Sequence, residues 1–241
     1  MKRHLQLFSE QMNYIVEDGL LDVSSRGLEK LSEIPENVTS LVCLSNSLRS
    51  LPTLPKNLKF LDCSNNKLTC LPELPKSLKI VKCSYNAIRY LPTLPNLRIL
   101  ECDYNLLTHL PELPLKMHTL MCSTNQLTSL PTIPESMRNL YCDENQLTEM
   151  PLLPKYLEKV FCGKNKIRVI PDLQHIVTLH YVSCPNNQLE YLPTTRPNIP
   201  NFTWHGNPLH KDLVKRLDGK TLKQQIEVIR TFNTPVIIWS V

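Results

Sequence analysis

The sequence is poor in the two smallest residues, with one alanine and five glycines among its 241 residues. It contains no Gly-rich phosphate-binding loop and no G-x-S-x-G motif. No segment approaches the roughly 20 apolar residues that a membrane-spanning helix needs. Residues 1–19 lack an apolar stretch of signal-peptide length. We therefore expect no membrane partner and a reducing, cytoplasmic compartment.

Paired metal ligands are missing as well. The chain has nine cysteines and seven histidines, but no C-x-x-C or H-x-x-x-H pair. No other arrangement of nucleophile and base stands out, so we expect no catalytic residue, no metal and no cofactor, and we interpret the chain as a non-enzyme. The net charge of +5, from 27 basic and 22 acidic residues, is modest and disfavours nucleic acid as a partner.

What the chain does have is a repeat of about 20 residues. Residues 58–77 read LKFLDCSNNKLTCLPELPKS, and residues 97–114 read LRILECDYNLLTHLPELP. The shared frame is L-x-x-L-x-C-x-x-N-x-L-x-x-L-P-x-L-P-x-x, which is typical of a leucine-rich repeat with one coil of a solenoid per period. Its cysteines are Cys43, Cys63, Cys83, Cys102, Cys122, Cys142, Cys162 and Cys184, and the asparagines three residues later are Asn46, Asn66, Asn86, Asn105, Asn125, Asn145, Asn165 and Asn187.

Each coil predicts a short strand followed by an extended return path. In x-L-x-C the side chains alternate, so Leu61 and Cys63 should point inward while Phe60 and Asp62 point outward. The L-P-x-L-P segment favours polyproline II, whose three-residue period puts both leucines on one side. Degenerate coils at each end, with Val23 and Trp204 in the cysteine position, bring the total to ten.

The predicted fold is an α/β-type solenoid dominated by β and extended structure, with helical caps. Its short parallel strands line the concave side, and its convex side is extended. Residues 1–18 show a helical apolar period and predict an N-terminal cap, residues 19–209 form the solenoid, and residues 210–241 form a C-terminal helical cap and tail. Gly219 should separate two helical stretches. The apolar tail PVIIWSV either packs on the cap or forms a sticky end.

The two ladders of repeated side chains have structural explanations. An asparagine side chain can bond backbone groups where the chain turns out of the strand. Free cysteine packs as a small hydrophobe, so we interpret the cysteine ladder as core rather than as zinc or disulfide sites. Cys70 is the exception, because it occupies a variable position of the coil.

The variable positions that point outward from the strands are the candidate binding surface. Exposed apolar patches rimmed by charge mark interaction sites, and aromatic residues dominate such interfaces. The alternative is that these side chains only cover one another along the sheet. We predict one patch formed by Phe60, Ile80, Tyr85, Ile99 and Tyr104, and a second, diagonal patch formed by Met121, Tyr141, Phe161 and Tyr181.

A strip of basic residues follows the first leucine of several coils, namely Lys59, Lys79, Arg98 and Arg138. It could contact an acidic partner or an RNA backbone, but Glu158 interrupts it, which favours a solubilising rim. Binding through this strip, in a ubiquitin or nucleic-acid pathway, is the alternative to protein binding on the concave face.

The coil resembles the short bacterial-type leucine-rich repeat of secreted effectors of the YopM and IpaH families, over about residues 19–209. Those families usually carry an aliphatic residue at the sixth position, where this chain has cysteine. The cysteine variant of the repeat resembles repeat proteins of large DNA viruses. The resemblance implies an effector-like, protein-binding scaffold in the cytoplasm, including that of a host cell. The IpaH-type ligases also have a C-x-D catalytic motif, and no cysteine here is followed two residues later by aspartate.

Overall fold

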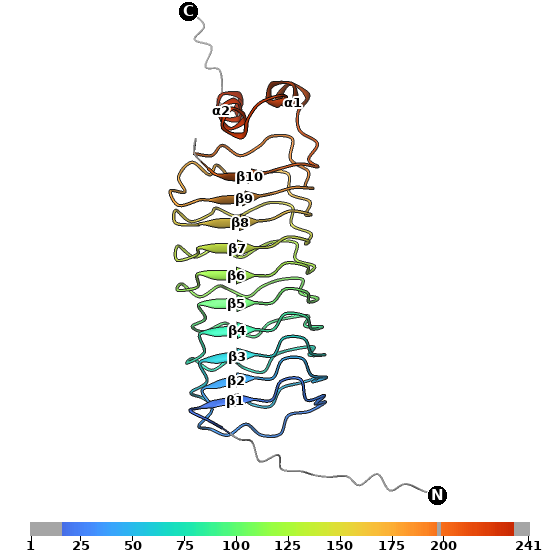
Figure 1. The fold of residues 1–241 in the computed structure, drawn as a ribbon, viewed down its shortest axis with the longest axis vertical. Coiled ribbons are helices and arrows are strands. Elements are labelled where there is room, and N and C mark those ends of the chain that lie inside the picture. Colours follow the sequence, from blue (N-terminus) through green and yellow to red (C-terminus); the bar gives the residue numbers. More distant parts are fainter. Residues whose placement is uncertain (1–15, 197–198, 234–241) are drawn as a thin grey trace, which may run out of the picture.

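A computed structural model describes residues 16–196 and 199–233 of the chain. Ten three-residue strands form one parallel sheet in chain order, so the predicted ten coils are confirmed (Figure 1). The strands are β1 (Leu20–Asp22), β2 (Ser40–Val42), β3 (Phe60–Asp62), β4 (Ile80–Lys82), β5 (Ile99–Glu101), β6 (Thr119–Met121), β7 (Asn139–Tyr141), β8 (Lys159–Phe161), β9 (Tyr181–Ser183) and β10 (Asn201–Thr203).

The strands lie in register because each coil has the same internal pattern. The middle residue of every strand points into the solenoid and is buried, as Leu61, Val81 and Leu100 show. The two flanking residues point outward and are half-buried in most coils. The cysteine that follows each of β2 to β9 is buried, so the predicted alternation is confirmed.

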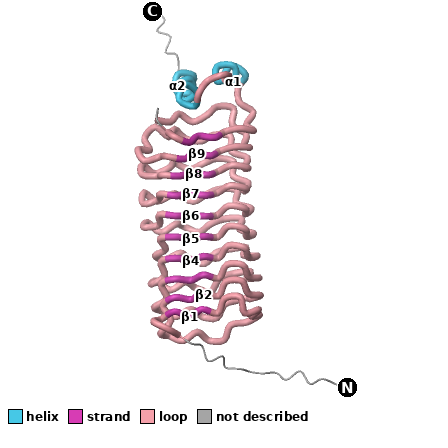
Figure 2. Tube along the Cα trace, viewed as in Figure 1, coloured by secondary structure: helices cyan, strands magenta, loops and turns pink. Residues whose placement is uncertain are grey.

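The return path on the convex side contains no helix between residues 16 and 196, as expected from its prolines (Figure 2). Both leucines of each L-P-x-L-P segment turn inward; Leu51 is 8% exposed and Leu54 5%. A turn then returns the chain to the sheet, with the Leu58 N–H donating to the Pro55 carbonyl at 3.1 Å. Because a coil of about 20 residues closes in this way, little room is left for a helix.

The asparagine ladder joins each coil to the one before it. The Asn105 side-chain amide donates to the carbonyls of Cys102 and Asp103 in its own coil and of Cys83 in the preceding coil, at 3.0–3.2 Å. Its Oδ1 accepts the Ile88 N–H at 3.0 Å. The same arrangement recurs along the solenoid and extends to Asn207 of the last coil. The structural interpretation of these asparagines is confirmed.

The C-terminal end of the solenoid is capped by two helices. They are α1 (Lys211–Leu217) and α2 (Leu222–Asn233), and Gly219, with φ +67°, lies between them as predicted. Leu213, Leu217, Ile226 and Ile229 are buried with the solenoid core. The apolar tail lies outside the described residues, as does nearly all of the predicted N-terminal cap, residues 1–18. Within the described ranges, neither helix is long and apolar enough to cross a membrane.

The cysteine ladder is part of the core. All eight cysteines of the ladder are 0–1% exposed, whereas Cys70 is partly exposed. Burial raises the pKa of the Cys43 and Cys184 thiols to about 12. Several thiols also approach a carbonyl of the next coil, as Cys122 does with Tyr141 at 3.3 Å. No thiolate is therefore available inside the solenoid at neutral pH.

In the native protein a thiol reagent is expected to modify one cysteine, Cys70, and in denaturant all nine. The reason is that the other eight are both inaccessible and protonated. Titration with a chromogenic disulfide, before and after unfolding, checks this. Cys70→Ser should abolish the native signal, while rapid native modification of all nine thiols would contradict the buried ladder.

Candidate functional site: the concave face of the sheet

Two rows of side chains cover the solvent-facing side of the sheet, and parallel register aligns each row across the coils. The first outward row comes from the first residue of each strand, and the second outward row from the third. Among the described residues, no helix or strand lies over these rows, because both helices lie at the C-terminal end (Figure 1). The side chains of both outward rows therefore face solvent.

The first outward row carries three apolar side chains on adjacent strands, Phe60, Ile80 and Ile99, here called the apolar trio. Register pairs Phe60 with Ile80 and Ile80 with Ile99. All three are half-buried. Toward the C-terminus the same row becomes polar, with Thr119, Asn139 and Lys159.

The second outward row becomes apolar where the first becomes polar. Tyr141 stacks on Phe161, with ring centroids 5.0 Å apart and planes 9° apart, and Met121 is in register with Tyr141. Phe161 also stacks on Tyr181 of the first row at 6.4 Å. The Lys159 ammonium lies 5.5 Å from the centre of the Tyr181 ring. These four residues, Met121, Tyr141, Phe161 and Tyr181, form a continuous diagonal.

Tyr85 and Tyr104 form a separate feature beyond the carboxyl ends of β4 and β5. Their rings stack at 4.3 Å and 11°, and they are 55% and 46% exposed. Lys82 and Glu101, joined by an ion pair of 3.0 Å, occupy the second outward row between this stack and the apolar trio. The five residues predicted as the first patch therefore lie in two groups on either side of a charged row.

The stacked tyrosines sit at a backbone position that is left-handed in every coil. This position, two residues after the cysteine in most coils, has φ of 57° at Tyr85 and 54° at Tyr104, and glycine occupies it in the last coil, as Gly206. A bulky residue with positive φ is uncommon. The conformation directs successive side chains of this position along the carboxyl edge of the sheet, where Asn65 and Glu144 occupy the same position.

Two aspartates directly after a cysteine link neighbouring coils along this carboxyl edge. Asp103 Oδ1 accepts the Ser123 N–H at 2.7 Å, and Asp143 Oδ1 accepts the Gly163 N–H at 2.8 Å. Burial, with the nearby charges of Glu101 and Asp143, raises the pKa of Asp103 to about 6. Burial raises the pKa of Asp143 as well. Asp143 did not feature in the sequence prediction. Serine occupies the same coil position in three other coils, as Ser64, Ser84 and Ser123.

Asp103→Asn is expected to stabilise the protein at neutral pH by about 1–2 kcal/mol, a value reduced for partial solvent exposure. The folded-state pKa lies above the unfolded value of 3.8, so the native state loses stability as pH rises from about 4 to about 6. Asparagine retains the acceptor for Ser123 without the charge. Urea unfolding at several pH values checks this.

The stability difference between Asp103→Asn and wild type should vanish below about pH 4, where the carboxyl group is protonated in both states. Glu112→Gln, at an exposed position on the return path, is the control and should change little. If Asp103→Asn were less stable than wild type at pH 7, the hydrogen bond from Ser123 to the charged carboxylate would outweigh the cost of burying that charge. That result would contradict the expected stabilisation.

The predicted basic strip lies along the amino edge of the sheet, where the strands begin. Lys59 and Arg98 are exposed and Lys79 is half-buried. Arg138 differs, because its guanidinium donates to three backbone carbonyls at 3.0–3.3 Å and lies 5.4 Å from the centre of the Tyr156 ring. Arg138 is therefore engaged with its own coil, and the cations available to a partner lie nearer the N-terminus.

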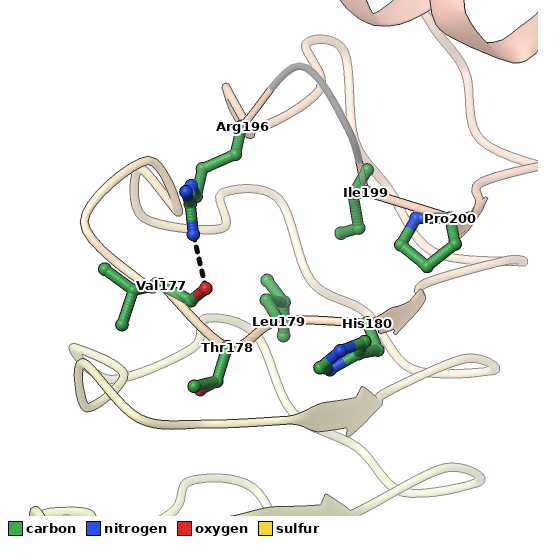
Figure 3. A pocket seen from close by; sticks show the side chains of 7 residues that line it. All are labelled: Val177, Thr178, Leu179, His180, Arg196, Ile199 and Pro200. Carbon is green, nitrogen blue, oxygen red and sulfur yellow. Dashed lines mark hydrogen bonds between the residues drawn. The ribbon is translucent and has the colours of Figure 1, made fainter.

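A pocket of about 270 Å³ lies between the residues that precede β9 and those that precede β10 (Figure 3). The Arg196 guanidinium donates to the Val177 carbonyl across it, and His180 lies at its other side. Among the described residues, its lining provides no carboxylate and no nucleophile apart from the Thr178 hydroxyl, which donates to the Leu157 carbonyl at 2.9 Å. In the described part of the chain, no three His, Cys, Asp or Glu side chains are placed to hold a metal ion.

Comparison with known proteins connects this architecture to bacterial effectors. No protein-family model matches the chain, and no curated protein matches it. Among solved structures, YopM from Yersinia enterocolitica WA-314 is 34% identical with a TM-score of 0.72, over 76% of this chain and 43% of that chain. YopM from Yersinia pestis is also 34% identical with a TM-score of 0.72, over 79% and 57%.

The leucine-rich-repeat domain of a Shigella effector is 27% identical with a TM-score of 0.51, over 83% of this chain and 75% of that one. The present chain spans about half the length of the two YopM chains. The chain is a leucine-rich-repeat protein of the short bacterial type.

Proposed function

We propose that this protein is a non-catalytic scaffold that binds a protein partner through the concave face of its solenoid. The observation that carries the proposal is the set of apolar and aromatic side chains in the two outward rows. They lie on a rigid sheet and no described element covers them. Solenoids present such extended concave surfaces to their partners.

The competing interpretation is that these side chains only shield one another. The stack of Tyr141 on Phe161 does cover part of each ring. Mutual cover is incomplete elsewhere, since Tyr85, Tyr104 and Tyr181 remain 41–55% exposed. Stacked rings also lose little rotamer freedom on binding, which makes them effective interface anchors. Shielding of one side chain by another does not explain why the rings of Tyr85, Tyr104 and Tyr181 remain exposed, whereas binding of a partner does.

The similarity to Yersinia and Shigella effectors supports an effector-like role in the cytoplasm of a host cell. The predicted lack of enzymatic activity is part of this proposal. Binding of RNA through the amino edge of the sheet is the second candidate, favoured by its exposed Lys59 and Arg98. A steep fall of affinity with salt would identify that mode.

The test is affinity capture from a eukaryotic cell lysate with wild type and with Phe60→Glu/Ile99→Glu. We expect a protein partner that wild type retains and the variant loses, because two carboxylates would be desolvated in the contact. Leu152→Glu/Val169→Glu is the matched control, since both residues are exposed on the return path, at 80% and 65%. Circular dichroism establishes that all three proteins are folded.

Identical partners for wild type and for Phe60→Glu/Ile99→Glu would overturn the concave-face proposal. Loss of the partner by Leu152→Glu/Val169→Glu alone would move the site to the return path. Detectable ubiquitin transfer by the purified protein would contradict the non-catalytic role.

A further inference from the structure

Five cations lie close together on three neighbouring coils at the amino edge of the sheet. Lys56, Lys59, Lys76, Lys79 and Arg98 are here called the basic edge; four are exposed and Lys79 is half-buried. None of the five belongs to an ion pair among the described residues. The basic edge is therefore an uncompensated patch of positive charge.

Two other cations, at or beyond the carboxyl ends of the strands, are paired with carboxylates within the fold. Lys82 pairs with Glu101 at 3.0 Å, and Lys164 pairs with Glu144 one coil away. On the basic edge the backbone ladder sets like charges beside each other, since the Lys79 N–H donates to the Lys59 carbonyl at 2.9 Å. Like charges at facing positions of a sheet are destabilising. A binding partner that supplies carboxylates would relieve this repulsion.

The basic edge also borders the apolar trio. Lys59, Lys79 and Arg98 immediately precede Phe60, Ile80 and Ile99, the first residues of β3, β4 and β5, so a cationic residue adjoins an apolar one at the start of each strand. The Arg98 N–H donates to the Lys79 carbonyl at 2.8 Å, which continues the alignment across all three coils. The result is an apolar strip with a parallel cationic strip along one side.

We propose that the segment of the partner that docks on β3–β5 is an acidic peptide chain with apolar anchors. Its apolar side chains would cover the trio, and its carboxylates would pair with the basic edge. This rests on the concave-face function proposed above and specifies the chemistry of the partner. Complementary charge at the rim of an apolar contact sets specificity and association rate more than affinity.

A nucleic acid fits this surface less well. Single-stranded nucleic acids bind through bases stacked on exposed aromatic rings beside a basic groove. Two members of the trio are isoleucines, and the stacked pair Tyr85 and Tyr104 lies beyond the second outward row. That side carries Asp62 and Asp103, neither of them in an ion pair among the described residues, and their charge would repel phosphates. The observations therefore favour a peptide.

Fluorescence anisotropy with three labelled probes tests the proposal. The probes are a short peptide that alternates leucine and phenylalanine with aspartate, the same peptide with lysine for aspartate, and a single-stranded RNA of similar length. We expect the acidic peptide to bind about tenfold or more tightly than its lysine counterpart, with affinity falling as salt rises. Lys59→Glu/Lys79→Glu should abolish this preference, whereas Lys211→Glu/Lys220→Glu, an equal charge change on the C-terminal cap, should retain it.

Three results would overturn the inference: equal or tighter binding of the lysine peptide, binding of neither peptide, or tighter binding of RNA than of the acidic peptide. The last would assign the basic edge to nucleic acid. Binding of the captured partner to the two double variants distinguishes the concave-face function from the acidic-partner inference. If Phe60→Glu/Ile99→Glu loses that partner while Lys59→Glu/Lys79→Glu keeps it with unchanged affinity, the concave-face function stands and the acidic-partner inference falls.

Discussion

Asn145→Ala is expected to destabilise the protein by about 3–5 kcal/mol. The Asn145 amide donates to the carbonyls of Cys122, Cys142 and Asp143 at 3.0–3.2 Å, and its Oδ1 accepts the Leu127 N–H at 3.0 Å. The side chain is buried, so alanine leaves these backbone groups without their partner and out of reach of most water. Urea unfolding followed by circular dichroism measures the loss.

Asn145→Asp separates hydrogen bonding from space filling. Aspartate has almost the same shape and can still accept from Leu127, but it would direct a carboxylate at three carbonyl oxygens. It should therefore destabilise at least as much as alanine at neutral pH. Asn96→Ala is the control, because Asn96 is exposed and donates to one carbonyl, that of Lys76. Wild-type stability of Asn145→Asp would contradict the role assigned to the ladder.

Leu100→Ala is expected to destabilise the protein by about 2–5 kcal/mol. Leu100 is fully buried in the middle of β5, in register with Val81 and Leu120 of the adjacent strands. Coils on both sides are held in place by the backbone ladder, so they cannot collapse into the space that the leucine leaves. Leu115→Ala, at a leucine that is 86% exposed, should change stability by less than about 0.5 kcal/mol. Equal effects of the two substitutions would contradict the assigned coil register.

The number of coils and the direction of each side chain within a strand could be predicted from the sequence. A period of about 20 residues, with leucine, cysteine and asparagine at fixed positions, leaves one register in which all of them face inward. Leu61, Cys63 and Asn66 therefore lie where the repeat indicates. The L-P-x-L-P return path follows from the stereochemistry of proline in the same way.

The candidate site was less predictable, because it depends on geometry that varies between coils. Tyr85 and Ile80 are close in the sequence, but a left-handed turn places the tyrosine beyond the carboxyl end of the strand, with Lys82 between them. The links from Asp103 to Ser123 and from Asp143 to Gly163 join different coils, and a single coil gives no indication of them. The left-handed backbone at Tyr85 and Tyr104 therefore explains why the first predicted patch is divided into two groups.

Stability and recognition are carried by different positions of the same repeat. The inward positions are nearly uniform, because each coil must match its neighbours in shape and hydrogen bonding. The outward positions differ from coil to coil, and none of the ladder bonds depends on them. Substitutions in the outward rows should therefore change binding while leaving the solenoid folded.

The most direct test of the central claim is photo-crosslinking with a benzophenone amino acid placed at Ile80 on the concave face or at Leu152 on the return path. Residue 80 belongs to the first outward row, and residue 152 is 80% exposed. The concave-face account predicts a crosslink to the captured partner from position 80 and none from position 152. A crosslink from position 152 alone would contradict it.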